Sequence, residues 1–559
     1  MKKYNVRFVG TDTVVRAEEG ASLLDVIRAN GIDIAADCGG RGRCGKCGVV
    51  VDGEPRLACE TKVVSDISVA LPERSGAYDI LTDFGGGVTS AGGGTVTSGV
   101  AGAGVVSERA GTSAGAGECA IAIDIGTTTV VAKLIGLPSG EDVWAVAELN
   151  EQRVYGADVI SRINASMDDS SLLSGVIVNQ LDRMVSKLLA ESGTDAARVA
   201  RVVVAGNTTM CYLLLGLPCR SLGLAPFEPA FQFNEAYTYN EVFRADTLQA
   251  PVHILPFISA FIGGDITAGL LTLDGKGGEQ HVTEAPSAVI AGADPQSTPS
   301  PAIEAEENAN DLGSYILVDM GTNGEIAYHS NNGLLCTSTA AGPAFEGGNI
   351  SCGSGSVEGA ISRLELANGA NKKFRYETIG GGAAHSICGS GILDAMACFA
   401  DAGIVKPTGA LNKKSPLVTE DGVPIAEGVT ITQKDVREFQ LAKSAIRAGI
   451  ETLISESGGI IPDRLYLAGG FGQHLDPESA FRIGLIPEAL RGKVIPIGNS
   501  SLAGAALAAL TKPAAANAAS PQTSEDYLKT AGAIASRGRE INLATHPTFN
   551  KLFMEHMMF

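Results

Sequence analysis

The sequence predicts a multidomain protein with a small α+β domain, a glycine-rich linker and a large two-lobed α/β region. In residues 1–72, alternating apolar positions and one helical stretch surround closely spaced cysteines. A run of glycines then interrupts the chain, and beyond it hydrophobic strands alternate with helices. At 559 residues, the chain is long enough for roughly three or four folding units.

Composition favours a globular protein and argues against two classes of partner. Apolar residues make up 45% of the chain and charged residues 19%, which is enough apolar material for buried cores. The net charge of -20 leaves no basic face for nucleic acid or an anionic membrane. The first residues lack an apolar signal-peptide core, and the charge-free stretches contain Asn, Pro or paired Gly. We therefore expect a cytoplasmic protein with no nucleic-acid or membrane partner.

Four cysteines in residues 1–72 predict an iron-sulfur site. The run CGGRGRCGKC is followed, after eleven residues, by a fourth cysteine that we expect on a strand returning from a VDGE turn. Soft thiolates suit iron, and glycines between them let the backbone wrap around a cluster. A structural zinc site is the main alternative, although such sites usually use two separated CxxC pairs. The expected ligands of a [2Fe-2S] cluster are Cys38, Cys44, Cys47 and Cys59.

On these residues, the segment 1–72 resembles the plant-type [2Fe-2S] ferredoxins, which implies a β-grasp ferredoxin-like fold. The spacing departs from the family's CxxxxCxxC by one added loop residue and a nearer fourth cysteine. These departures affect the expected reduction potential and not the cluster type.

Residues 73–117 are expected to form a flexible linker. From Gly85 to Gly117 there are 12 glycines in 33 residues, a composition that builds no packed core. A coil of this kind and length spans roughly 35–40 Å. It is either a passive spacer or an arm that carries the first domain between surfaces.

Two similar hairpins in the α/β region predict a phosphate site. AIAIDIGTTTVVAKL and YILVDMGTNGEIAYHS each place an Asp, a Gly and hydroxyl or amide side chains between two apolar strands. The Asp can hold Mg2+ through water, Gly lets the backbone approach, and the following residues donate to phosphate oxygens. Glycines after the later strand RLYLA leave room for a nucleoside. The candidate residues are Asp124, Gly126, Thr127, Thr128 and Thr129, then Asp319, Gly321, Thr322 and Asn323, then Gly469, Gly470 and Gly472.

In this order, the elements resemble the phosphate 1, phosphate 2 and adenosine motifs of the acetate kinase, sugar kinase, Hsc70 and actin superfamily. The resemblance implies a two-lobed α/β ATPase of the RNase H-like fold that closes on Mg-ATP. Asp124 and Asp319 would then be the catalytic acids. The implied units are lobe I over 118–312 with an insertion at 276–312, lobe II over 313–510, and a Pro/Ala/Ser-rich insertion and tail over 511–559.

Further segments, among them NEQRVYGADVISRI, AGNTTM and STAAGPAFEGGNISCG, are similar to those of reductive activators of corrinoid proteins. That resemblance implies ATP-dependent reduction of Co(II) to Co(I) in methyltransferase systems, a low-potential electron donor and a homodimer. The axial-histidine motif DxHxxG is absent, so the corrinoid is expected on a partner. Some members carry a middle domain before the ATPase, whereas here the first hairpin follows the linker directly.

Two other functions stay open. A small-molecule kinase would need a catalytic carboxylate, for which Asp265 and Glu325 are weak candidates, and it would not need a ferredoxin. An electron-transfer adaptor with regulatory nucleotide binding would need the cluster and not two intact hairpins.

Overall fold

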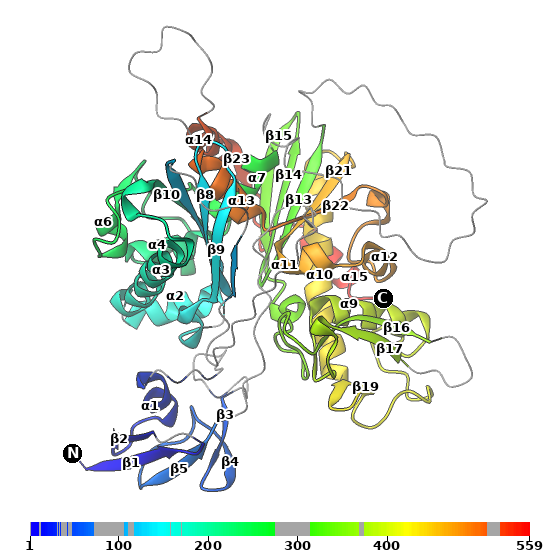
Figure 1. The fold of residues 1–559 in the computed structure, drawn as a ribbon. Helices are drawn as coiled ribbons and strands as arrows, with labels where there is room; N and C mark the ends of the chain where they lie inside the picture. Colours follow the sequence, from blue (N-terminus) through cyan, green and yellow to red (C-terminus); the bar gives the residue numbers. More distant parts are fainter. Residues whose placement is uncertain are drawn as a thin grey trace.

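The computed structural model describes residues 2–10, 13–30, 32, 34, 42, 47–71, 106–109, 117–156, 158–168, 170–273, 313–367, 374–510 and 526–559 (Figure 1). Cys38, Cys44 and the expected insertions at 276–312 and 511–525 lie outside the described residues, as do 73–105 and 110–116 of the expected linker.

The amino-terminal domain is a five-stranded mixed sheet with one long-range parallel pair. Its strand order is β2-β1-β5-β3-β4, in which β1 and β5 run parallel and the other neighbours antiparallel. Val6 and Phe8 of β1 are buried with Leu23 and Ile27 of the helix. This arrangement confirms the β-grasp ferredoxin-like fold. The elements are β1 (Lys3–Phe8), β2 (Val14–Glu18), α1 (Leu23–Ala29), β3 (Gly48–Val51), β4 (Glu54–Leu57) and β5 (Ile67–Ala70).

Lobe I, the part of the chain from 119 to 273, is built on a sheet of order β11-β12-β10-β7-β8-β9-β6. β7, β8 and β9 form an antiparallel meander, and β10 and β12 extend it in parallel. Its strands are β7 (Cys119–Ile125), β8 (Thr129–Gly136), β9 (Asp142–Leu149), β10 (Val199–Gly206), β11 (Tyr237–Thr238) and β12 (Pro251–Ile254). Its helices are α2 (Val159–Asp168), α3 (Ser170–Ser192), α4 (Thr208–Leu215), α5 (Arg220–Gly223), α6 (Tyr239–Phe243) and α7 (Gly264–Leu273).

Lobe II, from 315 to 498, repeats this plan in a sheet of order β22-β21-β13-β14-β15-β23. β13, β14 and β15 form the meander, and β21 and β22 extend it in parallel. The sheet strands are β13 (Tyr315–Met320), β14 (Gly324–Ser330), β15 (Gly333–Thr339), β21 (Arg464–Ala468) and β22 (Val494–Gly498). The two matching meanders confirm the two-lobed α/β fold.

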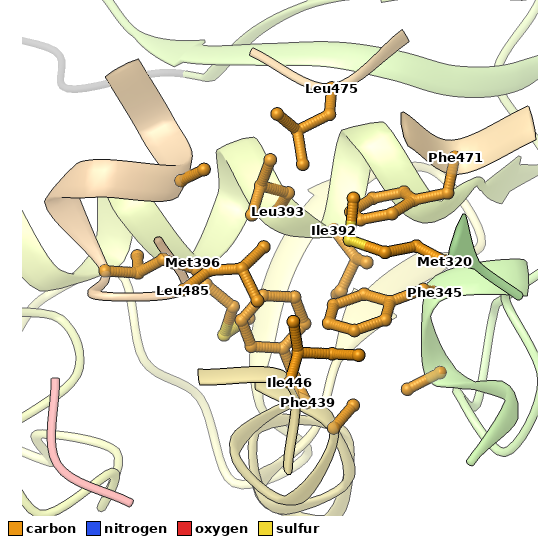
Figure 2. Close-up of a cluster of buried hydrophobic side chains, with 14 of the residues drawn as sticks. Met320, Phe345, Ile392, Leu393, Met396, Phe439, Ile446, Phe471, Leu475 and Leu485 are labelled. Carbon is orange, nitrogen blue, oxygen red and sulfur yellow. The ribbon is translucent and has the colours of Figure 1, made fainter. Parts of the chain in front are cut away.

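The remaining elements of lobe II surround a large hydrophobic core (Figure 2). Phe345, Phe439 and Phe471 meet there with side chains from α9. The elements are η3 (Pro343–Glu346), β16 (Ala360–Leu366), β17 (Phe374–Thr378), β18 (Ser386–Ile387), α9 (Gly389–Asp401), β19 (Val423–Ala426), β20 (Val429–Ile431), α10 (Gln433–Glu456), α11 (Gly469–His474) and α12 (Pro477–Arg482).

Helices at the junction join the two lobes. α7, α13 (Ser500–Ala509) and α14 (Tyr527–Arg537) lie where the two sheets approach each other (Figure 1). Side chains from β7, β13 and these helices form a single buried cluster. α13 follows lobe II in the chain but packs against β7 and β10 of lobe I. The two lobes therefore share a core at this junction.

One segment of the expected linker is more structured than its composition suggested. Residues 106–109 of the expected linker form β6 (Val106–Arg109), which pairs antiparallel with β9 at the sheet edge. The expectation of coil throughout 73–117 is therefore wrong for these residues. Edge pairing uses backbone groups, so glycine-rich flanks do not prevent it.

Two elements of the expected tail pack against lobe II. β23 (Gly538–Glu540) pairs with β15, and α15 (Phe549–Glu555) packs on α10. The buried Lys443 Nζ donates to the carbonyl of Met558 at 2.5 Å. Within the described part of the chain, no helix is both long and apolar enough to cross a membrane.

Candidate nucleotide and cluster sites

The first hairpin is the turn between β7 and β8, and glycine is required in it. A Cβ at Gly126 would lie 2.8 Å from the carbonyl oxygen of Thr129. The Gly126 carbonyl accepts a hydrogen bond from Asn150 Nδ2 at 2.8 Å. The Oγ1 of Thr127 accepts from Asn207 Nδ2 at 3.2 Å. Side chains from elsewhere in lobe I thus hold the turn in shape.

Asp124, near the end of β7, is held by the beginning of α13. Its two carboxylate oxygens accept from Ser501 Oγ at 2.7 Å and Asn499 Nδ2 at 2.9 Å. Asn499 also caps α13, since its Oδ1 accepts from the Leu502 N–H at 2.8 Å. Burial raises the pKa of Asp124, and these hydrogen bonds act against the shift. Asp124 as a whole residue is half-buried.

The second hairpin has the same plan at the end of β13. Gly321 donates its backbone N–H to the Asn323 carbonyl at 3.0 Å, which closes the turn. Asp319 pairs in register with Glu325 of β14. Thr322 is buried, with its hydroxyl directed to Glu346. The turn therefore presents backbone and short polar side chains, as phosphate binding requires.

The third predicted element follows β21 and approaches Asp319 closely. Gly469 has a φ of +86°, and a Cβ there would lie 2.9 Å from Asp319 Oδ1. Gly470 is exposed with open space around it, whereas Gly472 is buried near Leu467. The structure therefore brings Gly469 to the second hairpin and leaves Gly470 as the open position.

Five carboxylates from both lobes gather around the hairpins: Asp124, Asp265, Asp319, Glu325 and Glu346. Burial raises the pKa of Asp265 to about 7, and burial with the charges of Asp265 and Asp124 raises that of Asp319 to about 7. Burial also raises the pKa of Glu325 and Glu346. Among the described residues, no three acidic, His or Cys groups are close enough to hold a metal alone. Mg2+ commonly takes one or two carboxylates and completes its shell with water and phosphate, so this donor set fits it.

Polar residues that sequence patterns did not identify complete the site. Asn499 and Ser501 bind Asp124, and Glu346 contacts both hairpins. Arg162, fully buried, donates from Nη2 to the Thr127 carbonyl at 2.5 Å. Arg162 lies in NEQRVYGADVISRI and Glu346 in STAAGPAFEGGNISCG, two segments that resemble those of reductive activators, and this resemblance was the available signal.

Half of the predicted cluster site can be described. Cys47 is buried just before β3, and Cys59 is half-buried in the turn two residues past β4, and not on the strand as expected. Their Sγ atoms lie 3.2 Å apart. Two soft donors held this close fit joint ligation of one iron. Cys38 and Cys44 lie outside the described residues, so the four-ligand set stays a prediction.

Models of known protein families match three parts of the chain. A model of the 2Fe-2S iron-sulfur cluster binding domain matches 7–66, the RACo middle region matches 119–275, and the C-terminal domain of RACo, the ASKHA domain, matches 314–559. The second match shows that the expectation of a missing middle region was wrong, because that region is the part that contains the first hairpin.

Named relatives act on corrinoid proteins. The corrinoid activation enzyme RamQ of Eubacterium limosum is 31% identical over 470 residues, covering 78% of this chain and 70% of that protein. A [Co(II) methylated amine-specific corrinoid protein] reductase of Methanosarcina barkeri is 26% identical over 471 residues, covering 78% and 76%. The solved structure of a reductive activator for corrinoid, iron-sulfur protein is similar with a TM-score of 0.64 at 25% identity, covering 100% of this chain and 98% of that one.

Proposed function

This chain belongs to the family of reductive activators of corrinoid proteins, and we propose that it reduces the Co(II) form of a partner corrinoid protein to Co(I) with the help of nucleotide hydrolysis. The observation that carries the proposal is the combination, in one chain, of a ferredoxin fold with paired thiols and two facing phosphate hairpins.

The redox step moves one electron. A low-potential donor is oxidised by one electron, and cobalt in the partner goes from +2 to +1. When bound, a [2Fe-2S] cluster supplies a one-electron carrier between them. Cys47 and Cys59, with Cys38 and Cys44, are the proposed ligands. Their soft thiolates hold iron, and the β3–β4 hairpin fixes two of them.

The energy source is the hydrolysis of ATP to ADP and phosphate. For one electron, an illustrative gap of about 250 mV costs about 6 kcal/mol. A nucleotide covers such a gap only if its binding differs between two states by a factor on the order of 10⁴. The lobes supply two such states, because they share a core at one end and meet through hairpins at the other.

Within this site, each acidic group has a proposed task. Asp124 and Asp319 hold Mg2+ directly or through water, and the hairpin residues receive the phosphates. Asp265, at the start of α7, has a pKa of about 7 because burial disfavours its charge. A carboxylate with that pKa can accept a proton from attacking water near neutral pH.

Further features of the proposal rest on sequence and family likeness alone. These are a low-potential electron donor, a homodimer and the cytoplasmic location. The absence of a nucleic-acid partner stays a prediction from the net charge of -20.

The test mixes the holoprotein, a one-electron reductant and a Co(II) corrinoid protein with and without Mg-ATP. We expect the Co(I) absorption spectrum only with nucleotide. Equal reduction without ATP would support an electron-transfer adaptor, and steady phosphorylation of a metabolite would support a kinase. Either result contradicts the proposal.

A further inference from the structure

One carboxylate connects the two hairpins. Glu346 Oε2, at the end of η3 in lobe II, accepts a hydrogen bond from Thr128 Oγ1 of the first hairpin at 3.3 Å. The same oxygen accepts a shorter hydrogen bond from Thr322 Oγ1 of the second hairpin. A single atom thus joins the turns of both lobes.

The backbone that carries Glu346 is firmly anchored. The preceding Phe345 stacks on Phe471 with ring centroids 4.6 Å apart, and it meets Phe439 edge-on at 5.7 Å (Figure 2). The following Gly347 has a φ of +75°, and a Cβ there would lie 2.0 Å from the Ser354 carbonyl oxygen. Both chain neighbours of Glu346 are therefore closely packed, and a change of its contacts needs only a rotation of its own side chain.

The first hairpin is anchored in a similar way. Arg162 is fully buried and donates to the Thr127 and Gly156 carbonyls at 2.5 and 2.9 Å. Burial raises the pKa of Glu346, while hydrogen bonds from Thr322 and Thr128 and the Arg162 charge act against that shift. The contact between Thr128 and Glu346 therefore joins a hairpin held by Arg162 to a closely packed segment of lobe II.

This contact uses the donors that a phosphate needs. A threonine hydroxyl carries one proton and can donate it to a single acceptor. Glu346 Oε1 also stands 3.9 Å from the position of a Cβ on Gly321, where the hairpin backbone is open to a ligand. A phosphate oxygen received by Thr128 and Thr322 would take the same two protons and would be repelled by the carboxylate.

We propose that Glu346 is a positioning residue that ties the two hairpins together through Thr128 and Thr322 and that nucleotide phosphate displaces. When the phosphate enters, it replaces the Glu346 carboxylate as the acceptor of the two threonine hydroxyls. Unlike the carboxylate, the phosphate leaves the protein after hydrolysis. Phosphate occupancy thereby controls a contact between the lobes. This inference rests on the proposed function, for which it names the step that couples nucleotide to lobe movement.

The test compares Glu346→Ala, Glu346→Gln and the exposed control Glu358→Gln in the full holoprotein. Calorimetry measures binding of a non-hydrolysable ATP analogue with Mg2+, and hydrogen exchange follows peptides 126–130 and 321–325. We expect Glu346→Ala to bind about tenfold more tightly, equivalent to about 1.4 kcal/mol. Glu346→Gln should be intermediate, because its neutral amide competes less strongly, and the control should match the native chain.

Hydrogen exchange distinguishes this role from a merely structural one, because loss of a structural residue would not be compensated by the analogue. Both hairpins should exchange faster in Glu346→Ala before the analogue is added and at the native rate afterwards. Weaker binding in both Glu346 variants would instead make Glu346 a ligand of nucleotide or metal, and unchanged binding and exchange would reduce it to an incidental contact. Either result overturns the proposal, and the nearly isosteric Gln variant preserves the test if the Ala variant fails to fold.

These measurements need no corrinoid protein. If the native chain fails to reduce corrinoid while binding and exchange behave as expected, the proposed function fails and the role of Glu346 stands. If the native chain reduces corrinoid while the Glu346 variants bind like the control, only the role of Glu346 fails.

Discussion

Replacing Asp319 by Asn should abolish hydrolysis and, at alkaline pH, stabilise the folded protein. The pKa of this carboxyl is raised by burial and by the charges of Asp265, Asp124 and Glu346, and no hydrogen bond from the described residues offsets that rise. Its ionised form is therefore disfavoured in the folded state. Asparagine has nearly the same shape and no charge.

The size and sign follow from linkage. The pKa moves from its ordinary value of 3.8 to about 7. A change of this size corresponds to about 4 kcal/mol for a fully buried charge, and because Asp319 is only half-buried we expect about 2–4 kcal/mol. The folded state binds the proton more tightly, so stability falls as pH rises from about 4 to about 7 and the cost is complete above pH 7. Asp319→Asn removes that cost at pH 8 and changes little at pH 4.

The assay is calorimetric unfolding of the full chain without Mg2+ at pH 8 and at pH 4 to 5. We expect a rise in Tm of roughly 2–5 °C at pH 8, and ATP hydrolysis about a hundredfold slower or more. Asp421→Asn, at an exposed position, is the matched control. Asp124→Ala should lose hydrolysis equally but be destabilised by about 1–3 kcal/mol, because Ser501 and Asn499 lose their acceptor.

Lower stability of Asp319→Asn at pH 8 would refute the view that charge repulsion dominates at this carboxyl. Nearly normal hydrolysis in both Asp319→Asn and Asp124→Ala would mean that the nucleotide binds elsewhere.

Two more predictions concern the cluster domain and its tether. The double variant Cys44→Ala, Cys47→Ala should lose iron and the EPR signal of the reduced cluster while it keeps ATP hydrolysis, because the ATPase region has its own core; stoichiometric zinc without iron in the native protein would contradict the cluster assignment. Removing residues 85–105, which spares β6, should slow corrinoid reduction more than ATP hydrolysis, because the tether sets the reach of the first domain. If both rates match those of the native chain, the linker is a passive spacer.

Local patterns in the sequence were sufficient for the folds and for the hairpin residues. Asp124, Gly126 and Asp319 lie at fixed offsets from apolar strands, and that spacing determines where they lie in a hairpin. Contacts between distant segments follow no such period. Thr128 and Glu346 are 218 residues apart, and Asp124 and Ser501 are 377 apart. No spacing rule shows which loop glutamate or serine will reach them.

Composition failed for a different reason in part of the linker, and it made no prediction about the order of the tail. β6 is held by backbone pairing with β9, and the glycine content of the linker does not predict such pairing. β23 and α15 bury only a few side chains each against a lobe already built by earlier residues, so their own sequences carry little periodicity. Such segments are ordered by contact with another part of the protein. The local sequence of the segment alone does not reveal that contact.

The position of α13 also explains why the two aspartates of otherwise similar hairpins are held differently. β22 of lobe II ends at Gly498, and the next residue, Asn499, already donates to Asp124 of lobe I. The donors Asn499 and Ser501 lie one and three residues beyond the end of β22. A rotation of the lobe II sheet against lobe I would therefore shift both donors relative to Asp124. Asp319 has no such strand-to-carboxylate link among the described residues, and its surroundings are mainly other acids. The position of the Asp124 carboxylate thus depends on how the lobes are arranged, while the pKa of Asp319 depends on how much negative charge gathers beside it.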